Sequence, residues 1–329
     1  MRFHEGPTVT PAPAIDARTR LLVVAPHPDD ETLGAGALIR HVLAQGGSAD
    51  VLLLTDGDNN PWPQRWEERR VFIRAKDRAN WGRRRRGEVL AAMARLGLGQ
   101  SQLHALGWPD MGLTDALRFR HGPAVHAVRD VILRVRPGLV VMPDLADSHP
   151  DHGAAHVLAR LALWEAGSPA RVLTYMVHGR SDGGHRMTFD EPGASAGSRD
   201  IRLAAMREHR SQLILSERRM LAMAGRPECF GPAKPATGGA ALRLPWRPGH
   251  LARMRLRLLL ADGEGSVVWP WHKAPLAHRE GAWWLPLRQV PGPAFVKLTA
   301  DLATPWIHDH YGWACRDDAA SGLVAREPA

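Results

Sequence analysis

The chain has 329 residues, which is long enough for a full α/β domain and a smaller second one. Its hydrophobic content of 44% allows a buried core, and its net charge is +9. The two cysteines, Cys229 and Cys315, lie far apart and form no C-x-x-C pattern, which excludes a disulfide framework and a cysteine-based zinc site and favours a reducing cytoplasm. We expect no signal peptide and no membrane span, because residues 1–20 lack an apolar core and no apolar run approaches about 18 residues.

Short apolar runs alternate with helical stretches along the first two thirds of the chain. Strands are predicted at 21–25, 51–55, 103–106, 139–142 and 172–177, and helices at 34–45, 83–96, 124–135, 153–164 and 201–223. Such alternation is typical of a mostly parallel, Rossmann-like sheet with helices on both faces. Gly34 and Gly36 fail the spacing of a dinucleotide fingerprint, so we ascribe them to close packing of a helix on a strand.

The motif Pro26-His27-Pro28-Asp29-Asp30-Glu31 directly follows the first predicted strand. A histidine and adjacent carboxylates on a proline-stiffened turn offer one imidazole ligand, one carboxylate ligand and a second carboxylate that is free to act as a base. Hydrolytic zinc sites need this combination. The motif therefore predicts a metal site at a strand end.

A second cluster, Ser148-His149-Pro150-Asp151-His152, follows the apolar run 139–142. In an open α/β sheet, ligands bind beyond the carboxyl ends of the strands, where both motifs would lie. If Asp151 opens a helix, His149 and His152 lie three residues apart across its first turn and can face one side.

These residues resemble the LmbE/PIG-L family of zinc-dependent N-deacetylases, whose members remove acetyl groups from N-acetylglucosamine conjugates. The resemblance covers residues 20–230. It includes four further segments: Thr55-Asp56-Gly57, Arg85 with Glu88, Gly107-Trp108-Pro109-Asp110, and His209-Arg210-Ser211-Gln212.

The resemblance and the chemistry of amide hydrolysis imply the same set of roles. Zinc bound by His27, Asp30 and His152 would keep an open position for a water, whose pKa would fall toward about 7. Asp29 would take the proton of that water and deliver it to the departing amine. His149 would stabilise the oxyanion or protonate the leaving group.

Supporting roles are expected for four more residues. Arg85 and Asp110 match positions that contact substrate in some members, although Arg85 is also consistent with a solvated arginine and Asp110 with an ordinary turn. Glu31 is expected to cap the following helix or to orient a ligand, and Asp151 to cap its helix or to orient His152. Asp147 stands where some sugar deacetylases carry a tyrosine that assists the oxyanion, so no tyrosine-assisted variant is expected.

The positive charge is concentrated in residues 65–86, which hold ten Lys or Arg and three acidic residues. This segment is either a solvated face or a positive rim that attracts an anionic substrate or an anionic membrane surface. Nucleic acid is disfavoured, because no nucleic-acid-binding motif accompanies the charge. Residues 56–80 form a long insertion with tryptophans around it, which we interpret as a substrate lid or as a structural flap packed through those tryptophans.

We predict four regions along the chain: an N-terminal extension at 1–19, a deacetylase-like domain at 20–231, a linker at 232–240 and a β-rich, sandwich-like domain at 241–329. The last region carries turn signals between short apolar runs at 254–260, 266–269, 283–287 and 294–298. It also holds seven of the twelve tryptophans. These residues either fill a small β core or contact carbohydrate.

Three functions are compatible with the sequence. The favoured one is a zinc N-deacetylase, cytoplasmic or peripheral at the inner membrane surface, that acts on an N-acetylhexosamine-bearing glycan, glycolipid or lipopolysaccharide-type conjugate. A zinc amidase of the same fold acting on a non-sugar or antibiotic-like amide would share every catalytic residue. The third is a binding protein for anionic glycans or nucleic acid, which the complete set of ligands and the presence of Asp29 disfavour.

Overall fold

The protein is described by a computed structural model that covers residues 13–179, 196–234, 241–287, 292–300 and 311–315. It forms two compact units. The first, here called the sheet unit, comprises Met1–Gly112, Val131–Asp144 and Pro169–Ala233; the second unit comprises Leu113–Asp130, Leu145–Ser168 and Lys234–Ala329. The four predicted regions stay a prediction.

The sheet unit contains a six-stranded, mostly parallel sheet, which confirms the predicted fold class. Its strand order is β3-β2-β1-β4-β5-β6, and only β6 runs antiparallel to its neighbour. The strands are β1 (Arg20–Ala25), β2 (Ser48–Thr55), β3 (Leu103–Trp108), β4 (Leu139–Pro143), β5 (Arg171–Tyr175) and β6 (Gly231–Pro232). All five predicted strands are present, and β6 lies where the sequence predicted the start of a linker.

Because of the strand order, the two motifs follow strands that are neighbours in the sheet. β1 pairs in parallel with β2 on one side and with β4 on the other, with Leu21 opposite Leu139. The chain continues from β1 toward β2 and from β4 toward β5, so β1 and β4 flank the point at which the strand order reverses. Such switch points are where open α/β sheets bind ligands.

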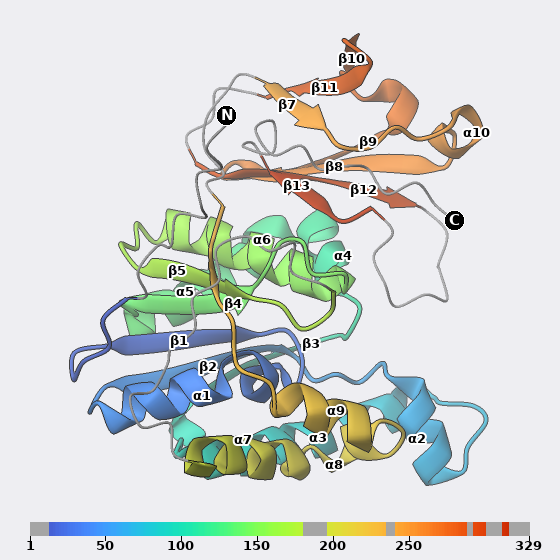
Figure 1. Cartoon of the computed structure of the whole chain (residues 1–329). Helices are drawn as coiled ribbons and strands as arrows, with labels where there is room; N and C mark the ends of the chain where they lie inside the picture. Colours follow the sequence, from blue (N-terminus) through green and yellow to red (C-terminus); the bar gives the residue numbers. More distant parts are fainter. Residues whose placement is uncertain (1–12, 180–195, 235–240, 288–291, 301–310, 316–329) are drawn as a thin grey trace, which may run out of the picture. The chain divides into compact units, whose positions relative to one another are not determined.

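Helices flank this sheet (Figure 1). Those of the sheet unit are α1 (Asp30–Ala44), α2 (Pro61–Glu68), α3 (Ala75–Leu96), the short 3₁₀ helix η1 (Gln100–Gln102), α7 (Ala196–Glu208), α8 (Arg210–Leu213) and α9 (Glu217–Ala224). α1 packs on β1 and β2, and α7 packs on α1 and α3. A Cβ atom at Gly34 of α1 would lie 2.5 Å from the Tyr175 ring of β5, which confirms the predicted close packing of helix on strand.

Three helix predictions need correction. The stretch 201–223 is not one helix, because the helical chain is interrupted at His209 and again at Ser216, which are the N-cap residues of α8 and α9. α3 begins eight residues before the predicted start, where the Asp77 carboxylate accepts a hydrogen bond from the Arg74 amide at 3.0 Å. α2 forms inside the stretch where no helix was predicted, with Pro61 at its first position, a favourable place for proline.

Both faces of the sheet are buried. Leu21, Val23, Val51, Leu53 and Val141 belong to one apolar cluster with side chains of α1, α3 and α7. The alternate residues of the same strands are also buried, among them Leu22, Val24, Leu52, Leu54 and Val140. Continuous apolar runs of this kind are typical of parallel strands covered on both sides.

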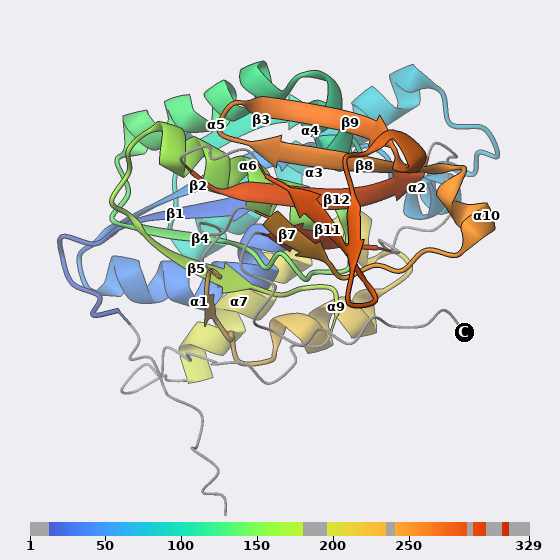
Figure 2. The same ribbon diagram turned by 90° about the horizontal axis from the view of Figure 1, so that it is seen from above.

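The second unit contains two antiparallel sheets, as predicted for the C-terminal region. One has the order β10-β11-β7 and the other β13-β12-β8-β9, whose strands β9, β8 and β12 are seen side by side in Figure 2. The strands are β7 (Ala241–Leu244), β8 (Leu256–Asp262), β9 (Gly265–Pro270), β10 (Ala277–Arg279), β11 (Ala282–Pro286), β12 (Ala294–Ala300) and β13 (Trp313–Cys315). Side chains of both sheets, with Trp246 and Trp271, form one apolar cluster, so these two tryptophans fill the core. Trp306 lies outside the described residues.

Helices from the middle of the chain belong to this unit as well. They are α4 (Leu113–Phe119) and α6 (Pro150–Glu165), with the short η2 (Trp271–Lys273) and α10 (His250–Arg253); α5 (His121–Val135) is shared between the units. α4 contacts α6, β8 and β9. A Cβ atom at Gly153 of α6 would lie 2.5 Å from the Trp313 ring of β13. The C-terminal strands therefore pack directly on α4 and α6.

No helix in the described part of the chain combines the length and the apolar character of a membrane span.

Candidate active site

The first motif forms a tight turn between β1 and α1. The His27 carbonyl accepts a hydrogen bond from the Asp30 amide at 3.2 Å, and the Asp30 carboxylate accepts one from the His27 amide at 3.0 Å. Thr55, at the end of β2, donates hydrogen bonds to the Pro26 carbonyl through both its amide and its hydroxyl. The turn is thus fixed from within and from the neighbouring strand.

The imidazole of His27 lies between two carboxylates. Its Nδ1 is 3.3 Å from Asp30 Oδ2, and its Nε2 is 3.2 Å from Asp110 Oδ1. Burial alone would raise the pKa of Asp110, but the charges of His27 and Arg85 lower it below its ordinary value. The structure therefore brings Asp110 to the first histidine, and its predicted contact with substrate stays a prediction.

Asp29 adopts an unusual backbone conformation at the start of α1. Its φ angle is 117°, a region that is strained for any residue other than glycine. Strain of this kind persists only where the surroundings enforce it, and it concentrates at functional sites. Burial and the adjacent Asp30 carboxylate raise the pKa of Asp29 to about 7, although Arg85, whose guanidinium lies 3.6 Å from Asp29 Oδ2, partly opposes this.

Glu31 accepts a hydrogen bond from the Asp29 backbone and is paired with His209. The Glu31 carboxylate accepts hydrogen bonds from the Asp29 amide at 3.0 Å and from the Thr32 hydroxyl at 2.6 Å, and its Oε1 lies 2.8 Å from His209 Nε2. Burial alone would raise the pKa of Glu31 and lower that of His209, but each group shifts the other in the opposite direction, so that the pKa of Glu31 falls and that of His209 rises. The two side chains therefore form a fully buried ion pair.

Arg85 of α3 links two loops of the site through hydrogen bonds to their backbone. Its buried guanidinium donates hydrogen bonds to the Pro28 carbonyl at 2.6 Å and to the Gly57 carbonyl at 2.7 Å. Gly57 has a positive φ of 61°, and a Cβ atom there would lie 1.8 Å from Arg85 Nη1. The guanidinium is thus engaged with the backbone rather than solvated, and its predicted contact with substrate stays a prediction.

The second motif forms the start of α6 in the second unit. His149 is the N-cap residue, and its Nδ1 accepts a hydrogen bond from the Asp151 amide at 3.2 Å. A neutral imidazole that accepts at Nδ1 carries its proton at Nε2, from which it can donate to an oxyanion. The ring centroids of His149 and His152 are 5.2 Å apart.

Asp147 contacts His152, a pairing that the sequence analysis did not anticipate. Its Oδ2 lies 3.1 Å from His152 Nδ1, and its Oδ1 accepts a hydrogen bond from the His149 amide at 3.0 Å. Asp151, which was predicted to cap its helix or to orient His152, accepts a hydrogen bond from the Leu113 amide at 3.1 Å, at the start of α4. Its predicted role stays a prediction, while Asp147 is the carboxylate in contact with His152.

Two features could have pointed to the residues that the sequence analysis left without a role. His209 belongs to a segment that was noted only for its family resemblance, and a histidine in that segment is a natural partner for one of three consecutive carboxylates. Asp147 lies five residues before His152, close enough for a loop to turn its carboxylate back toward the ring. Neither pairing follows from spacing alone.

The donor groups suit a divalent metal. Two imidazoles and one carboxylate, from His27, His152 and Asp30, are the ligand types of catalytic zinc sites. A ligating histidine almost always donates its second ring nitrogen to a carboxylate or a carbonyl, and the contact of His152 Nδ1 with Asp147 has this form.

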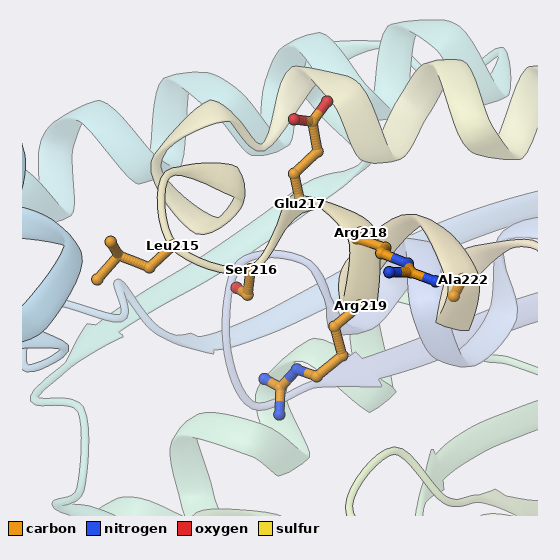
Figure 3. Close-up of a pocket in the computed structure, with 6 residues that line it drawn as sticks. All are labelled: Leu215, Ser216, Glu217, Arg218, Arg219 and Ala222. Atoms are coloured by element: carbon orange, nitrogen blue, oxygen red, sulfur yellow. The ribbon is translucent and has the colours of Figure 1, made fainter.

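The surface of the sheet unit has a depression that contains none of the predicted site residues. It is open, has a volume of about 650 Å³ and is lined by residues of α9 and of the turn before it: Leu215, Ser216, Glu217, Arg218, Arg219 and Ala222 (Figure 3). In the view, Glu217 and Arg219 point in opposite directions. This open surface offers no convergent set of polar groups.

Fold and motifs together define an α/β protein in which histidine and carboxylate side chains follow two neighbouring parallel strands. Residues 22–163 match the family described as PIG-L: GlcNAc-PI de-N-acetylase. The chain therefore contains a domain of the PIG-L (LmbE) family, which confirms the resemblance seen in the sequence.

Several relatives carry deacetylase names. A 1D-myo-inositol 2-acetamido-2-deoxy-alpha-D-glucopyranoside deacetylase of Mycolicibacterium paratuberculosis is 39% identical over 147 residues, which cover 40% of this chain and 47% of the relative. A diacetylchitobiose deacetylase of Thermococcus kodakarensis is 30% identical over 153 residues, which cover 46% of this chain and 51% of the relative. The chain thus spans about half the length of these relatives.

Among solved structures, a conserved protein of Thermus thermophilus is 28% identical, with a TM-score of 0.48, and the match covers 70% of this chain and 99% of that protein.

Proposed function

We propose that this protein is a metal-dependent N-deacetylase that removes the acetyl group from an N-acetylhexosamine conjugate and releases acetate. The observation that carries the proposal is the turn after β1, where the strained and buried Asp29 stands beside His27 and Asp30. Two relatives support this substrate class, because their names describe deacetylases of an acetamido-sugar linked to inositol and of diacetylchitobiose.

We infer that His27, Asp30 and His152 hold one divalent metal, with zinc as the expected ion. Three supports can be given. First, β1 and β4 are parallel neighbours, so the chain leaves both at the same edge of the sheet. Second, only five residues separate the end of β4 from His149. Third, His152 has a carboxylate at its second nitrogen. When bound, a metal at these ligands supplies Lewis-acid chemistry, which polarises the acetyl carbonyl and acidifies a water.

The side chains of the protein carry the proton transfers. Asp29, with its pKa raised to about 7 by burial and by Asp30, accepts a proton from the attacking water near neutral pH. As the C–N bond breaks, the same carboxyl group returns that proton to the amine. His149 Nε2–H donates a hydrogen bond to the developing oxyanion, and Glu31 and Arg85 keep the Asp29 backbone in place.

Acetate release by the zinc-loaded protein tests this proposal. The panel contains N-acetylglucosaminyl-inositol, diacetylchitobiose, and phosphorylated, lipid-linked and lipopolysaccharide-type N-acetylhexosamine conjugates. We expect release from at least one conjugate. It should fall about 10² to 10⁴-fold in Asp29→Asn, because a positioned general base contributes a factor of that size.

Two controls make the result interpretable. Metal content is measured for each variant, and Asp200→Asn, which changes an exposed carboxylate on α7, should keep full activity. Unchanged release in Asp29→Asn would remove Asp29 from the mechanism. Absence of release from the whole panel, with metal bound, would overturn the sugar substrate and favour a non-sugar or antibiotic-like amide.

A further inference from the structure

The outward face of α2 and the loop after it expose an unusual group of large apolar side chains. Trp62 is 68% exposed, Trp66 70%, Val71 75% and Phe72 83%. They account for four of the eleven exposed large hydrophobic residues in the described part of the chain, and they fall within eleven consecutive positions. Single exposed apolar residues are ordinary, whereas a contiguous group marks an interaction surface.

The geometry of α2 keeps these side chains on the outside. Trp62 and Trp66 are four residues apart and so lie on one side of the helix. The opposite side is buried through Pro63 and Gln64, and the Gln64 amide donates a hydrogen bond to the Asp77 carbonyl of α3 at 3.0 Å. Because α2 is already packed through its other side, the tryptophans cannot turn inward without breaking this contact. Trp62 and Trp66 thus do not pack on the domain as the structural-flap alternative requires, while the buried Trp81 does, and the substrate-lid interpretation stays a prediction.

Exposed basic side chains lie in the same segment as the apolar group. Residues 65–86 hold ten Lys or Arg against three acidic residues. Arg69 and Arg78 are exposed, and the Arg65 guanidinium lies 5.2 Å from the centre of the Trp62 ring. Figures 1 and 2 both show α2 and the following loop at one end of the sheet unit, projecting away from the strands.

We propose that the aromatic-basic surface formed by Trp62, Trp66, Val71, Phe72, Arg69 and Arg78 docks the protein on an anionic lipid bilayer. Tryptophan and phenylalanine rings enter the boundary between headgroups and acyl chains, and arginines beside them bind the lipid phosphates. Charge complementarity selects this occupant, because a protein partner for an apolar patch needs no cluster of exposed cations, and Arg69, Arg74, Lys76 and Arg78 are all exposed in the same segment. The proposal does not depend on which acetylated conjugate is cleaved.

Flotation of the full-length protein with lipid vesicles tests the docking. Vesicles of phosphatidylcholine alone are compared with vesicles that also contain phosphatidylglycerol, each at low and at high salt. We expect binding to the anionic vesicles that weakens at high salt, since surface electrostatics are screened. Equal binding to both vesicle types, or binding to neither, would overturn the proposal.

Two pairs of variants assign the binding to this surface. Trp62→Ala with Trp66→Ala should lower partitioning about tenfold or more, because two aromatic rings lose their burial. Arg69→Gln with Arg78→Gln should lower it about 25-fold, since each basic residue near an anionic surface contributes about 1 kcal/mol, a factor of about five.

Matched controls lie elsewhere on the molecule. Leu251→Ala with Met254→Ala removes comparably exposed apolar side chains at α10, and Arg218→Gln with Arg219→Gln removes two exposed arginines of α9. Both controls should bind like the unchanged protein, and an equal loss in them would overturn the assignment. Sedimentation of the same variants without lipid tests whether a second copy of the chain, instead of a bilayer, binds this surface. A dimer that dissociates when Trp62 and Trp66 are replaced would show that a second copy, and not a bilayer, covers the surface.

Discussion

Three consecutive carboxylates in this chain have three different partners. Asp29 faces Arg85, Asp30 is bonded to His27, and Glu31 is paired with His209. Because each partner stabilises a different charge or hydrogen bond, the three groups need not share a protonation state. Chemically similar neighbours can thus take the different roles of base, ligand and support that we propose for them.

Asp147 offers a first test at the residue scale. Asp147→Ala should weaken zinc binding about 10 to 100-fold, because His152 loses the carboxylate at its Nδ1. Asp147→Asn, which keeps a hydrogen-bond acceptor, should recover part of the affinity. Competition with a chelator measures the affinity, and Asp144→Ala, which removes a nearby carboxylate bonded to Thr174, is the control. Unchanged affinity in Asp147→Ala would contradict this role.

The buried pair of Glu31 and His209 gives a second test. His209→Leu should lower the free energy of unfolding by about 3–5 kcal/mol, because a buried carboxylate loses its partner. The double variant Glu31→Leu with His209→Leu should recover much of that loss, since no unpaired charge remains. Urea unfolding of the wild type, both single variants and the double variant completes the cycle. Strictly additive losses would mean that the two side chains do not stabilise each other.

At the scale of elements, the site depends on how loops and helices support one another. The loop after β2 reaches the first motif through Arg85 of α3, which bonds the Gly57 and Pro28 carbonyls. α1 is held in a similar way: Arg202 of α7 donates to the Thr32 and Leu33 carbonyls, and the Glu228 carboxylate accepts from the Ala37 and Leu38 amides.

Gly57→Ala tests the support from the loop. The added methyl group would occupy the position of the Arg85 guanidinium, at a φ angle that disfavours alanine, so Arg85 should release the Pro28 carbonyl and kcat should fall. The control is Gly87→Ala on α3, where a Cβ atom has no neighbour within 4 Å. That variant should keep its activity and gain up to about 1 kcal/mol in stability. Full activity in Gly57→Ala would show that the link through Arg85 is dispensable.

The elements that the sequence predicted well are those with a strong local pattern. Continuous apolar runs located all five parallel strands, and motifs at the ends of two of them located the candidate site. α2 was missed because it is only eight residues long and contains Pro61 and Pro63, and the break at His209 was missed because the helical pattern continues across it. The pairing of Glu31 with His209 joins residues 178 positions apart, which no local pattern encodes.

At the scale of the whole molecule, the second unit draws on three separate stretches of chain. Trp313 lies against Gly153, and Trp164 lies against Gly263 and Gly292, so the C-terminal strands and α6 cover each other. A chain that ends at residue 233 should therefore expose apolar surface of α4 and α6.

Truncation after residue 233 measures this dependence. We expect a lower melting temperature and increased binding of a hydrophobic dye, since the apolar contacts of α4 and α6 are lost. The full-length chain is the reference. A truncated protein that melts like the full-length one would instead support the predicted boundary between a self-sufficient domain and an accessory one.

The ion pair of Glu31 and His209 also has a consequence for biosynthesis. The ribosome adds about 5–20 residues per second, so His209 is made about 10 to 35 seconds after Glu31. Throughout that interval the turn that carries His27, Asp29 and Asp30 lacks its buried counter-charge. In the last part of the interval, after residue 163, this is so although the whole of the matched family region has already been made. The nascent chain should therefore complete the proposed active site late, only after the α7–α9 segment has emerged and docked.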